Sequence, residues 1–384
     1  MIYLDYNATT PLCAPAWEAM QPYFTRHFGN PSSVHRAGRE TRAAIDNARD
    51  ELAALLRVKP HELIFTSGGT ESNNLALLGL ARNLAPNGKH LISNRAEHHA
   101  VLHTLEHLEK REGFEITWLD LSRDGLIDPD ALAAAIRPDT ILVSIMTANN
   151  ETGVIQPMAE IAGRCRSRGV LLHSDMVQSF GKLETDLNGI DAASFAAHKF
   201  HGPKGVGFLY LRAGLPIDRI QFGGSHEGER RPGTENVAAI AGLAAAARFI
   251  TEKRPNESKL RDELWAGVGK VFPAAQANGA GAPRLGNTLN VSFPGHSSET
   301  LLMALDLEGI CASSGSACMV GSVVASHVLL AMGLPLEHAA SAIRFSLGKE
   351  TTAEEIEAII DAIARVLQRQ PRQPAAHPAE HALA

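Results

Sequence analysis

Short apolar runs alternate along the chain with longer stretches of helical periodicity. The first four runs are apolar on both faces, which is typical of strands in a parallel sheet that helices cover. A glycine turn and a helix that begins near Glu71 follow the first run directly. This alternation predicts a doubly wound α/β domain. The predicted strands lie at 63–66, 89–93, 141–146, 170–172, 205–212 and 288–293.

The C-terminal third predicts a second, smaller lobe, joined to the first by a helical stretch near 238–250. Thr352 and Glu355 form a capping-box pattern, and apolar residues at helical spacing follow it from Ile356 to Leu367. The last residues are rich in Pro, Ala and His without a period, which favours disorder. We therefore expect a large domain at 15–250, a small α+β domain made of 1–14 and 251–368, and a disordered tail at 369–384.

Composition and charge exclude several classes of protein. Of the 384 residues, 45% are hydrophobic and 20% are charged, as in an ordinary soluble enzyme. The net charge is −6 and no basic stripe is present, so nucleic acid is not an expected partner. No apolar run is long enough to span a bilayer, and the N-terminus has no secretory signal. The four cysteines form no CxxC pair, which favours free thiols in a reducing cytoplasm.

Polar clusters follow four of the expected strands directly. They are Ser67–Thr70, Asn149–Glu151, His173–Gln178 and His198–Lys199. In an open α/β sheet, ligands bind outside the carboxyl ends of the strands. The clusters therefore predict one shared ligand site.

The segment SGGTES at 67–72 is a candidate phosphate site, because its glycines admit an anion and the next helix offers free N–H groups. A tight strand-to-helix turn explains the same residues equally well. Asp175 ends a buried apolar strand, where a carboxylate needs a cationic partner. A protonated pyridine nitrogen would serve, and a cap on the following helix is the alternative.

Lysine and cysteine residues supply candidate nucleophiles. Lys199 and Lys204 stand near a strand end, where a lysine of lowered pKa can form a Schiff base, and spacing does not choose between them. Cys318 closes the small-residue run ASSGSAC, which favours an accessible loop and a nucleophilic thiolate. A buried thiol that packs as a small hydrophobe is the alternative, and it is the interpretation for the other three cysteines.

Histidines cluster after the second strand. His98 begins the helical stretch at the strand end, where it could transfer protons. His99, His103 and His107 share one helix face, a spacing that can chelate a metal. A solvated face explains these three better, because no cysteine or carboxylate partner lies nearby in the sequence. No intrinsic metal site is expected.

Together these segments resemble the cysteine desulfurases of the NifS/IscS group, which belong to the class V aminotransferases of pyridoxal-phosphate fold type I. The likeness extends from Tyr3 to Gly348. It implies a large domain with a mainly parallel seven-stranded sheet covered by helices, a smaller α+β domain and a homodimer. The matching segments are YLDYNATTP, FGNPSSVH, FTSGGTESNN, AEHHAVL, NNETGVIQP, DMVQ, HKFHGPKG, RPGTENV, SSGSAC and RFSLG.

The resemblance implies pyridoxal 5'-phosphate as the cofactor and Lys199, not Lys204, as its Schiff-base lysine. Asp175 would pair with the ring nitrogen, Gln178 would bind the ring hydroxyl oxygen, and Val177 and His98 would cover the two ring faces. The remaining roles implied are phosphate binding by Gly69, Thr70, His198 and the partner subunit's Thr234, cofactor and substrate binding by Asn150, and substrate binding by Asn30 and by Arg344 through the carboxylate.

The implied reaction removes sulfur from L-cysteine with Lys199, His98 and Cys318 as catalytic residues. It leaves L-alanine and a persulfide on Cys318, which an iron–sulfur scaffold or another sulfur acceptor would take. Cys318 is also a candidate transient ligand of an iron–sulfur cluster. A selenocysteine lyase, a class V aminotransferase and a non-catalytic scaffold are the alternatives. The presence of both Lys199 and Cys318 argues against them.

The chain departs from the resembling family at a few positions. Ala196 stands where a phosphate-binding serine is common, Met176 replaces a usual alanine, and Gly228 stands where arginine is frequent. The segment SVVASHVL after Cys318 lacks the usual proline and acidic residue. We expect weaker cofactor retention and altered acceptor behaviour, with the core chemistry kept.

Overall fold

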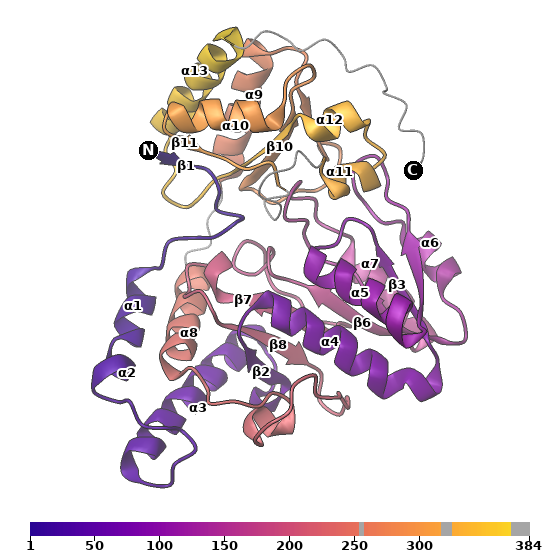
Figure 1. Cartoon of the computed structure of the whole chain (residues 1–384), viewed down its shortest axis with the longest axis vertical. Coiled ribbons are helices and arrows are strands. Elements are labelled where there is room, and N and C mark those ends of the chain that lie inside the picture. The colour runs from indigo at the N-terminus through magenta and orange to yellow at the C-terminus, as the bar shows by residue number, and fades with distance from the viewer. Residues whose placement is uncertain (253–256, 316–324, 370–384) are drawn as a thin grey trace, which may run out of the picture.

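The computed structural model describes residues 1–252, 257–315 and 325–369. A seven-stranded sheet forms the centre of the lower lobe in Figure 1, in the order β2-β8-β7-β6-β5-β3-β4. Only β8 runs against its neighbours, and the other pairings are parallel. The strands are β2 Leu63–Thr66, β3 His90–Asn94, β4 Glu115–Leu119, β5 Thr140–Ser144, β6 Leu171–Asp175, β7 Ala192–Ala196 and β8 Gly207–Leu211.

Consecutive strand residues enter two different apolar cores, one on each face of this sheet. Ile64 and Leu142 pack with helices α4 and α5 on one face. Phe65 and Val143 pack with α1, α3, α7 and α8 on the other. Side chains alternate across a strand, so both faces are covered, as the doubly apolar runs predict. The helices are α1 Ala14–Met20, α2 Pro22–Thr25, α3 Arg36–Leu56, α4 Gly69–Leu84, α5 His99–Glu112, α6 Pro129–Ala135, α7 Met158–Arg168 and α8 Val237–Glu252.

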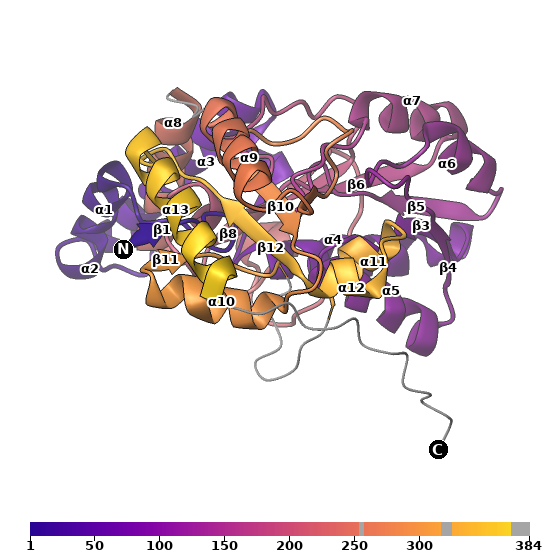
Figure 2. The same cartoon turned by 90° about the horizontal axis from the view of Figure 1, so that it is seen from above.

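The upper lobe combines both ends of the described chain. Strand β1 (Ile2–Tyr3) pairs with β11 (Ile310–Cys311), and Leu4 packs in the same core as the C-terminal helix (Figure 1). Helices α9 and α13 lie side by side next to β10 (Figure 2). The other elements of this lobe are β9 Gln276–Ala277, β10 Thr288–Ser292, β12 Ala342–Ser346, α9 Ser258–Val271, α10 Ser298–Leu307, α11 His327–Ala331, α12 Leu336–Ala340 and α13 Ala353–Arg369. The large lobe also contains the 3-10 turns η1 Pro60–Glu62, η2 Ala85–Asn87, η3 Ala197–Lys199 and η4 His226–Glu229.

The fold type I architecture that the resemblance implies is confirmed, while some strand bounds are corrected. The predicted strand 170–172 is wrong in extent, because β6 continues to Asp175. His173 is fully buried there, yet its ring contacts Ser144 Oγ at 2.9 Å and Ser194 Oγ at 3.0 Å. Polar side chains that satisfy one another can thus extend a buried strand. The capping box of α13 is confirmed, since Thr352 and Glu355 bond each other's backbone N–H.

The predicted tail lies outside the described residues, apart from Arg369, which ends α13. Among the described residues, none of the helices combines the length and apolar character that a membrane span requires.

Candidate active site

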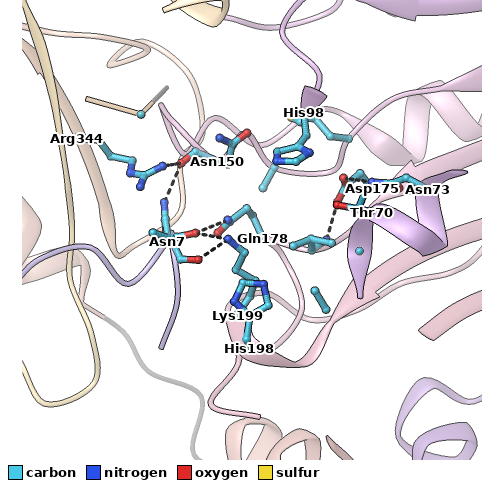
Figure 3. A pocket seen from close by; sticks show the side chains of 17 residues that line it. Asn7, Thr70, Asn73, His98, Asn150, Asp175, Gln178, His198, Lys199 and Arg344 are labelled. Atoms are coloured by element: carbon cyan, nitrogen blue, oxygen red, sulfur yellow. Dashed lines mark hydrogen bonds between the residues drawn. The ribbon is translucent and has the colours of Figure 1, made fainter. Parts of the chain in front are cut away.

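A cavity of about 330 Å³ opens at the carboxyl ends of β5, β6 and β7 and at the start of α4. Its walls come from distant parts of the chain, as Figure 3 shows. The large sheet contributes Asp175 and Lys199, the N-terminal segment contributes Asn7, and the small lobe contributes Arg344. The polar clusters that follow the strands therefore converge on one site, as the sequence predicts.

Asp175 is 6% exposed and lies at the end of β6 against the cavity. Its Oδ2 accepts a hydrogen bond from Asn73 Nδ2 at 2.7 Å, and its Oδ1 accepts one from the Val177 N–H at 2.9 Å. Both donors are neutral, so a cation in the cavity would stabilise this buried carboxylate further. A protonated ring nitrogen fits that requirement.

The start of α4 forms one end of the cavity. The N–H groups of its first turn have no intrahelical partner, and the helix dipole favours an anion there. Gly69, Thr70 and His198 line this end. A Cβ added to Gly69 would lie 2.8 Å from Val177 Cγ2, so glycine lets the helix start approach Val177 closely. These residues fit a phosphate group.

Lys199 ends the 3-10 turn after β7 and points into the cavity (Figure 3). Its Nζ donates to the carbonyl oxygens of Asn7 at 2.8 Å and Ala8 at 2.7 Å. Lys204, which the spacing left open, is exposed and is not among the described residues that line the cavity.

His98 and Val177 also line the cavity. His98 caps α5, because its Nδ1 accepts the Ala100 N–H at 3.1 Å, so the neutral ring carries its proton on Nε2. Burial lowers the pKa of His98, against the opposing charge of Asp175. Burial also lowers the pKa of His198 to about 4, helped by the charge of Lys199. Both rings are therefore neutral near pH 7.

Arg344 is 2% exposed and connects three segments at the cavity. It donates from Nη1 to the Asn150 carbonyl at 3.0 Å (Figure 3). It also donates from Nη2 to Asp5 Oδ1 at 2.6 Å. Its Nε is buried and has no hydrogen-bond partner among the residues that the structure describes. A carboxylate in the cavity would satisfy that donor.

Two predicted residues do not reach the cavity within this single chain. Asn30 is exposed, and its Oδ1 accepts the Ser32 N–H at 2.9 Å, which ties it to a local turn. Thr234 is also exposed and stays a prediction that concerns a second subunit. Cys318 lies outside the described residues, whereas Gly315 lines the cavity.

Sequence reasoning missed Asn7, Asn73 and Glu97. Asn7 and Asn73 lie within segments that carry the family resemblance. Their place in those segments was the only feature of the sequence that could have marked them as site residues. Glu97 is fully buried behind His98, where its Oε1 accepts from Asn94 Nδ2 and the Met146 N–H. Burial, reinforced by the charge of Asp175, raises the pKa of Glu97 to about 8. This carboxyl is therefore protonated near pH 7.

Histidines on one face of α5 contact other histidine rings. His99 stacks on His103 with ring centroids 4.9 Å apart, and it contacts His327 at 4.5 Å. Within the described ranges, no group of three or more His, Cys, Asp or Glu side chains could hold a metal ion.

Fold and cavity together define a pyridoxal-phosphate enzyme of fold type I: a lysine, a carboxylate and a helix N-terminus line one ring-sized cleft. The aminotransferase class-V family model matches residues 2–359, and the chain belongs to that family. Members of this family depend on pyridoxal phosphate.

Curated relatives and solved structures agree with this assignment. The cysteine desulfurase IscS of Dictyoglomus turgidum is 46% identical, covering 96% of this chain and 95% of the relative. The cysteine desulfurase IscS of Methanosarcina thermophila is 44% identical, covering 96% and 92%. A NifS-like protein has a TM-score of 0.90 at 36% identity, covering 96% and 99%. A structure of SspA in complex with cysteine has a TM-score of 0.81 at 34% identity, covering 92% and 100%.

Proposed function

We propose that this protein is a cysteine desulfurase, which converts L-cysteine to L-alanine and passes the sulfur to an acceptor. The observation that carries the proposal is the meeting of Lys199, Asp175 and Arg344 around one cavity of ring size. Curated relatives that cover nearly the whole chain carry this activity in their names, and a similar solved structure is described as a complex with cysteine.

When bound, pyridoxal phosphate supplies an electron sink that stabilises negative charge at the substrate Cα. Asp175 keeps the ring nitrogen protonated, because a buried carboxylate favours a cation beside it. Gly69, Thr70 and His198 hold the phosphate, and Gln178 donates to the ring hydroxyl oxygen. Val177 and His98 hold the two faces of the ring.

Arg344 binds the substrate carboxylate, together with Asn150. The Lys199 amine moves the proton at the substrate Cα, and His98 serves as a proton donor or acceptor on the opposite face. The Cys318 thiolate then attacks the substrate sulfur: a sulfur–sulfur bond forms, the Cβ–sulfur bond breaks, and the electron pair stays with the carbon fragment. Protonation of that fragment gives alanine, so no external oxidant is required.

Chain length supports the role of Cys318. It follows Gly315, a lining residue, by three positions, which is a span of roughly 10 Å of extended chain at most. The persulfide is a reversible product that a thiol acceptor can remove. We further propose a cytoplasmic homodimer in which the partner subunit's Thr234 completes the phosphate site and an iron–sulfur scaffold accepts the sulfur.

The proposal is tested by incubating the purified protein with pyridoxal phosphate, L-cysteine and a reductant, and by measuring alanine and sulfide. The wild type should release both products in equal amounts. Cys318→Ala should lose sulfide release, whereas Cys311→Ala, the matched control, should keep it. A protein that gains no visible absorption with pyridoxal phosphate would refute the proposal, and undiminished sulfide from Cys318→Ala would remove that thiol from the mechanism.

A further inference from the structure

A second lysine lies next to the active site and has no part in the reaction described above. Lys182 follows β6 in the chain, and its Nζ donates to Asn7 Oδ1 and to Gln178 Oε1, both at 2.8 Å. Lys182, Lys199, Glu257 and Lys349 all line a small cavity of about 20 Å³. Both amides that Lys182 contacts also line the main cavity.

An ammonium group has three donors and no acceptor, so only the oxygen end of an amide can face it. Lys182 therefore faces the oxygen of the Asn7 and Gln178 side-chain amides, and the N–H₂ end of each amide points away from Lys182. The Gln178 Nε2 is turned to the Asn7 carbonyl, to which it donates at 2.9 Å. The Asn7 Nδ2 is turned to Thr288 Oγ1 at 2.9 Å and to the Asn150 carbonyl at 3.2 Å.

The same contacts extend to the catalytic lysine. The Asn7 carbonyl accepts hydrogen bonds from Gln178 Nε2 and from Lys199 Nζ (Figure 3). The Asn7 side chain is in turn held by Lys182 and by Asn287 Nδ2. Lys182 thus acts on Lys199 through one intermediate residue.

The charged groups that act on Lys182 are mostly cations. Lys199 on η3 and Arg344 on β12 act on Lys182 as cations, and Glu257 before α9 acts as the opposing carboxyl. Burial and the charge of Lys199 lower the pKa of Lys182 to about 7, and burial raises the pKa of Glu257. A positive environment of this kind favours an anionic oxygen in the adjoining cavity.

We propose that Lys182 is a positioning residue for the cofactor. Its Nζ donates to Gln178 Oε1, which leaves the Gln178 N–H₂ end free to face the ring hydroxyl oxygen. The same Nζ donates to Asn7 Oδ1 and so fixes the residue whose backbone carbonyl accepts from Lys199. This inference rests on the proposed function, because Gln178 takes its role from that reaction. It adds a residue outside the cavity wall that determines how Gln178 can bind.

The test measures the dissociation constant of pyridoxal phosphate with apoprotein. Lys182→Met keeps an unbranched side chain that is one atom shorter and removes the donors. Hydrogen bonds to charged groups contribute about 1.5–3 kcal/mol, so the dissociation constant should rise roughly tenfold to hundredfold. Lys349→Met is the matched control, because this exposed lysine borders the same small cavity and should leave binding within about twofold.

A double-mutant cycle with Gln178→Leu separates positioning from general stability. If Lys182 acts through Gln178, Lys182→Met should weaken binding by less than about threefold in the Gln178→Leu background. Lys182→Arg, which is also a donor without an acceptor, should recover most of the wild-type affinity. Should Lys182→Met fail to fold by circular dichroism, Lys182→Gln replaces it in the same cycle.

Two results would overturn the inference: wild-type affinity in Lys182→Met, or fully additive effects of the two substitutions. A failure of this inference can be told apart from a failure of the proposed function. Wild-type apoprotein that binds no pyridoxal phosphate contradicts the proposed function itself, whereas strong binding by both wild type and Lys182→Met contradicts only the role of Lys182.

Discussion

Asp175 and Glu97 are two buried carboxyl groups near one cavity, and their surroundings differ. Asp175 borders the cavity and accepts one hydrogen bond at each oxygen. Glu97 is fully buried, and within the described part of the chain its Oε2 has no hydrogen-bond partner. Burial without a neighbouring cation raises the pKa of Glu97, so this carboxyl stays neutral, whereas Asp175 faces the cavity in which a ring nitrogen would lie.

Glu97→Gln should change how stability depends on pH. The pKa of Glu97 is about 8 in the folded chain and about 4.5 when it is exposed. Between these values the folded state binds a proton that the unfolded state has lost, so rising pH destabilises the wild type. Glutamine resembles the protonated carboxyl and removes this decline. Urea midpoints at pH 5 and pH 8.5 should therefore differ less in Glu97→Gln than in the wild type.

The exposed Glu357 provides the control, because Glu357→Gln should keep the wild-type difference between the two pH values. An equal decline in Glu97→Gln and the wild type would show that Glu97 is not the titrating group.

At the scale of an element, the start of helix α4 depends on Gly68, the residue directly before it. Gly68 has φ 151° and ψ −176°, a region that other residues rarely adopt. A Cβ added there would meet no atom within 4 Å, so the requirement for glycine is conformational rather than steric. The backbone of Gly68 sets where the free N–H groups of α4 point.

Gly68→Ala should therefore cost about 1–3 kcal/mol of stability and weaken binding of pyridoxal phosphate, because relief of the strain moves the helix start. Urea unfolding and cofactor titration would measure both effects. Gly163, inside α7, also has open space around an added Cβ but has ordinary helical geometry. Gly163→Ala should be neutral or stabilising by up to about 1 kcal/mol. Equal behaviour of the two variants would refute the conformational argument.

At the scale of the whole molecule, the cavity depends on contacts between segments that are far apart in the sequence. Arg344 and Asp5 are 339 positions apart and form an ion pair at 2.6 Å. The segment before α8, which carries Thr234, is fixed to the large domain by Arg49 and Glu227, whose carboxylate also accepts the Phe65 N–H. Thr234 is exposed on this anchored segment, where a second subunit could use it.

Hybrid dimers test whether Thr234 acts across the interface. Lys199→Ala and Thr234→Ala homodimers should have little activity or weak cofactor binding. In a hybrid of the two chains, one site would combine intact Lys199 with the partner subunit's Thr234. That hybrid should recover about half of the wild-type activity per dimer, together with wild-type cofactor affinity at one site. Recovery would be absent if Thr234 served its own chain.

The local features of this protein can be predicted from its sequence alone. A doubly apolar run located β2 at its first residue, the run at 288–293 did the same for β10, and the polar clusters after the strands marked the cavity. These signals depend on neighbouring residues and on the two-residue period of a strand. The extent of strands with buried polar residues was harder to predict. His173 is compatible with β6 only because Ser144 and Ser194 face it.

Only the tertiary structure decided which distant groups meet. It selected Lys199 over Lys204 as a lining residue, brought Asn7 and Arg344 to the same cavity, and placed Lys182 behind Gln178. Side-chain hydrogen bonds between segments hundreds of positions apart leave no periodic trace in a single sequence. Their partners are determined by how the two lobes pack, which is why the local pattern predicts the site's position and the fold determines its chemistry.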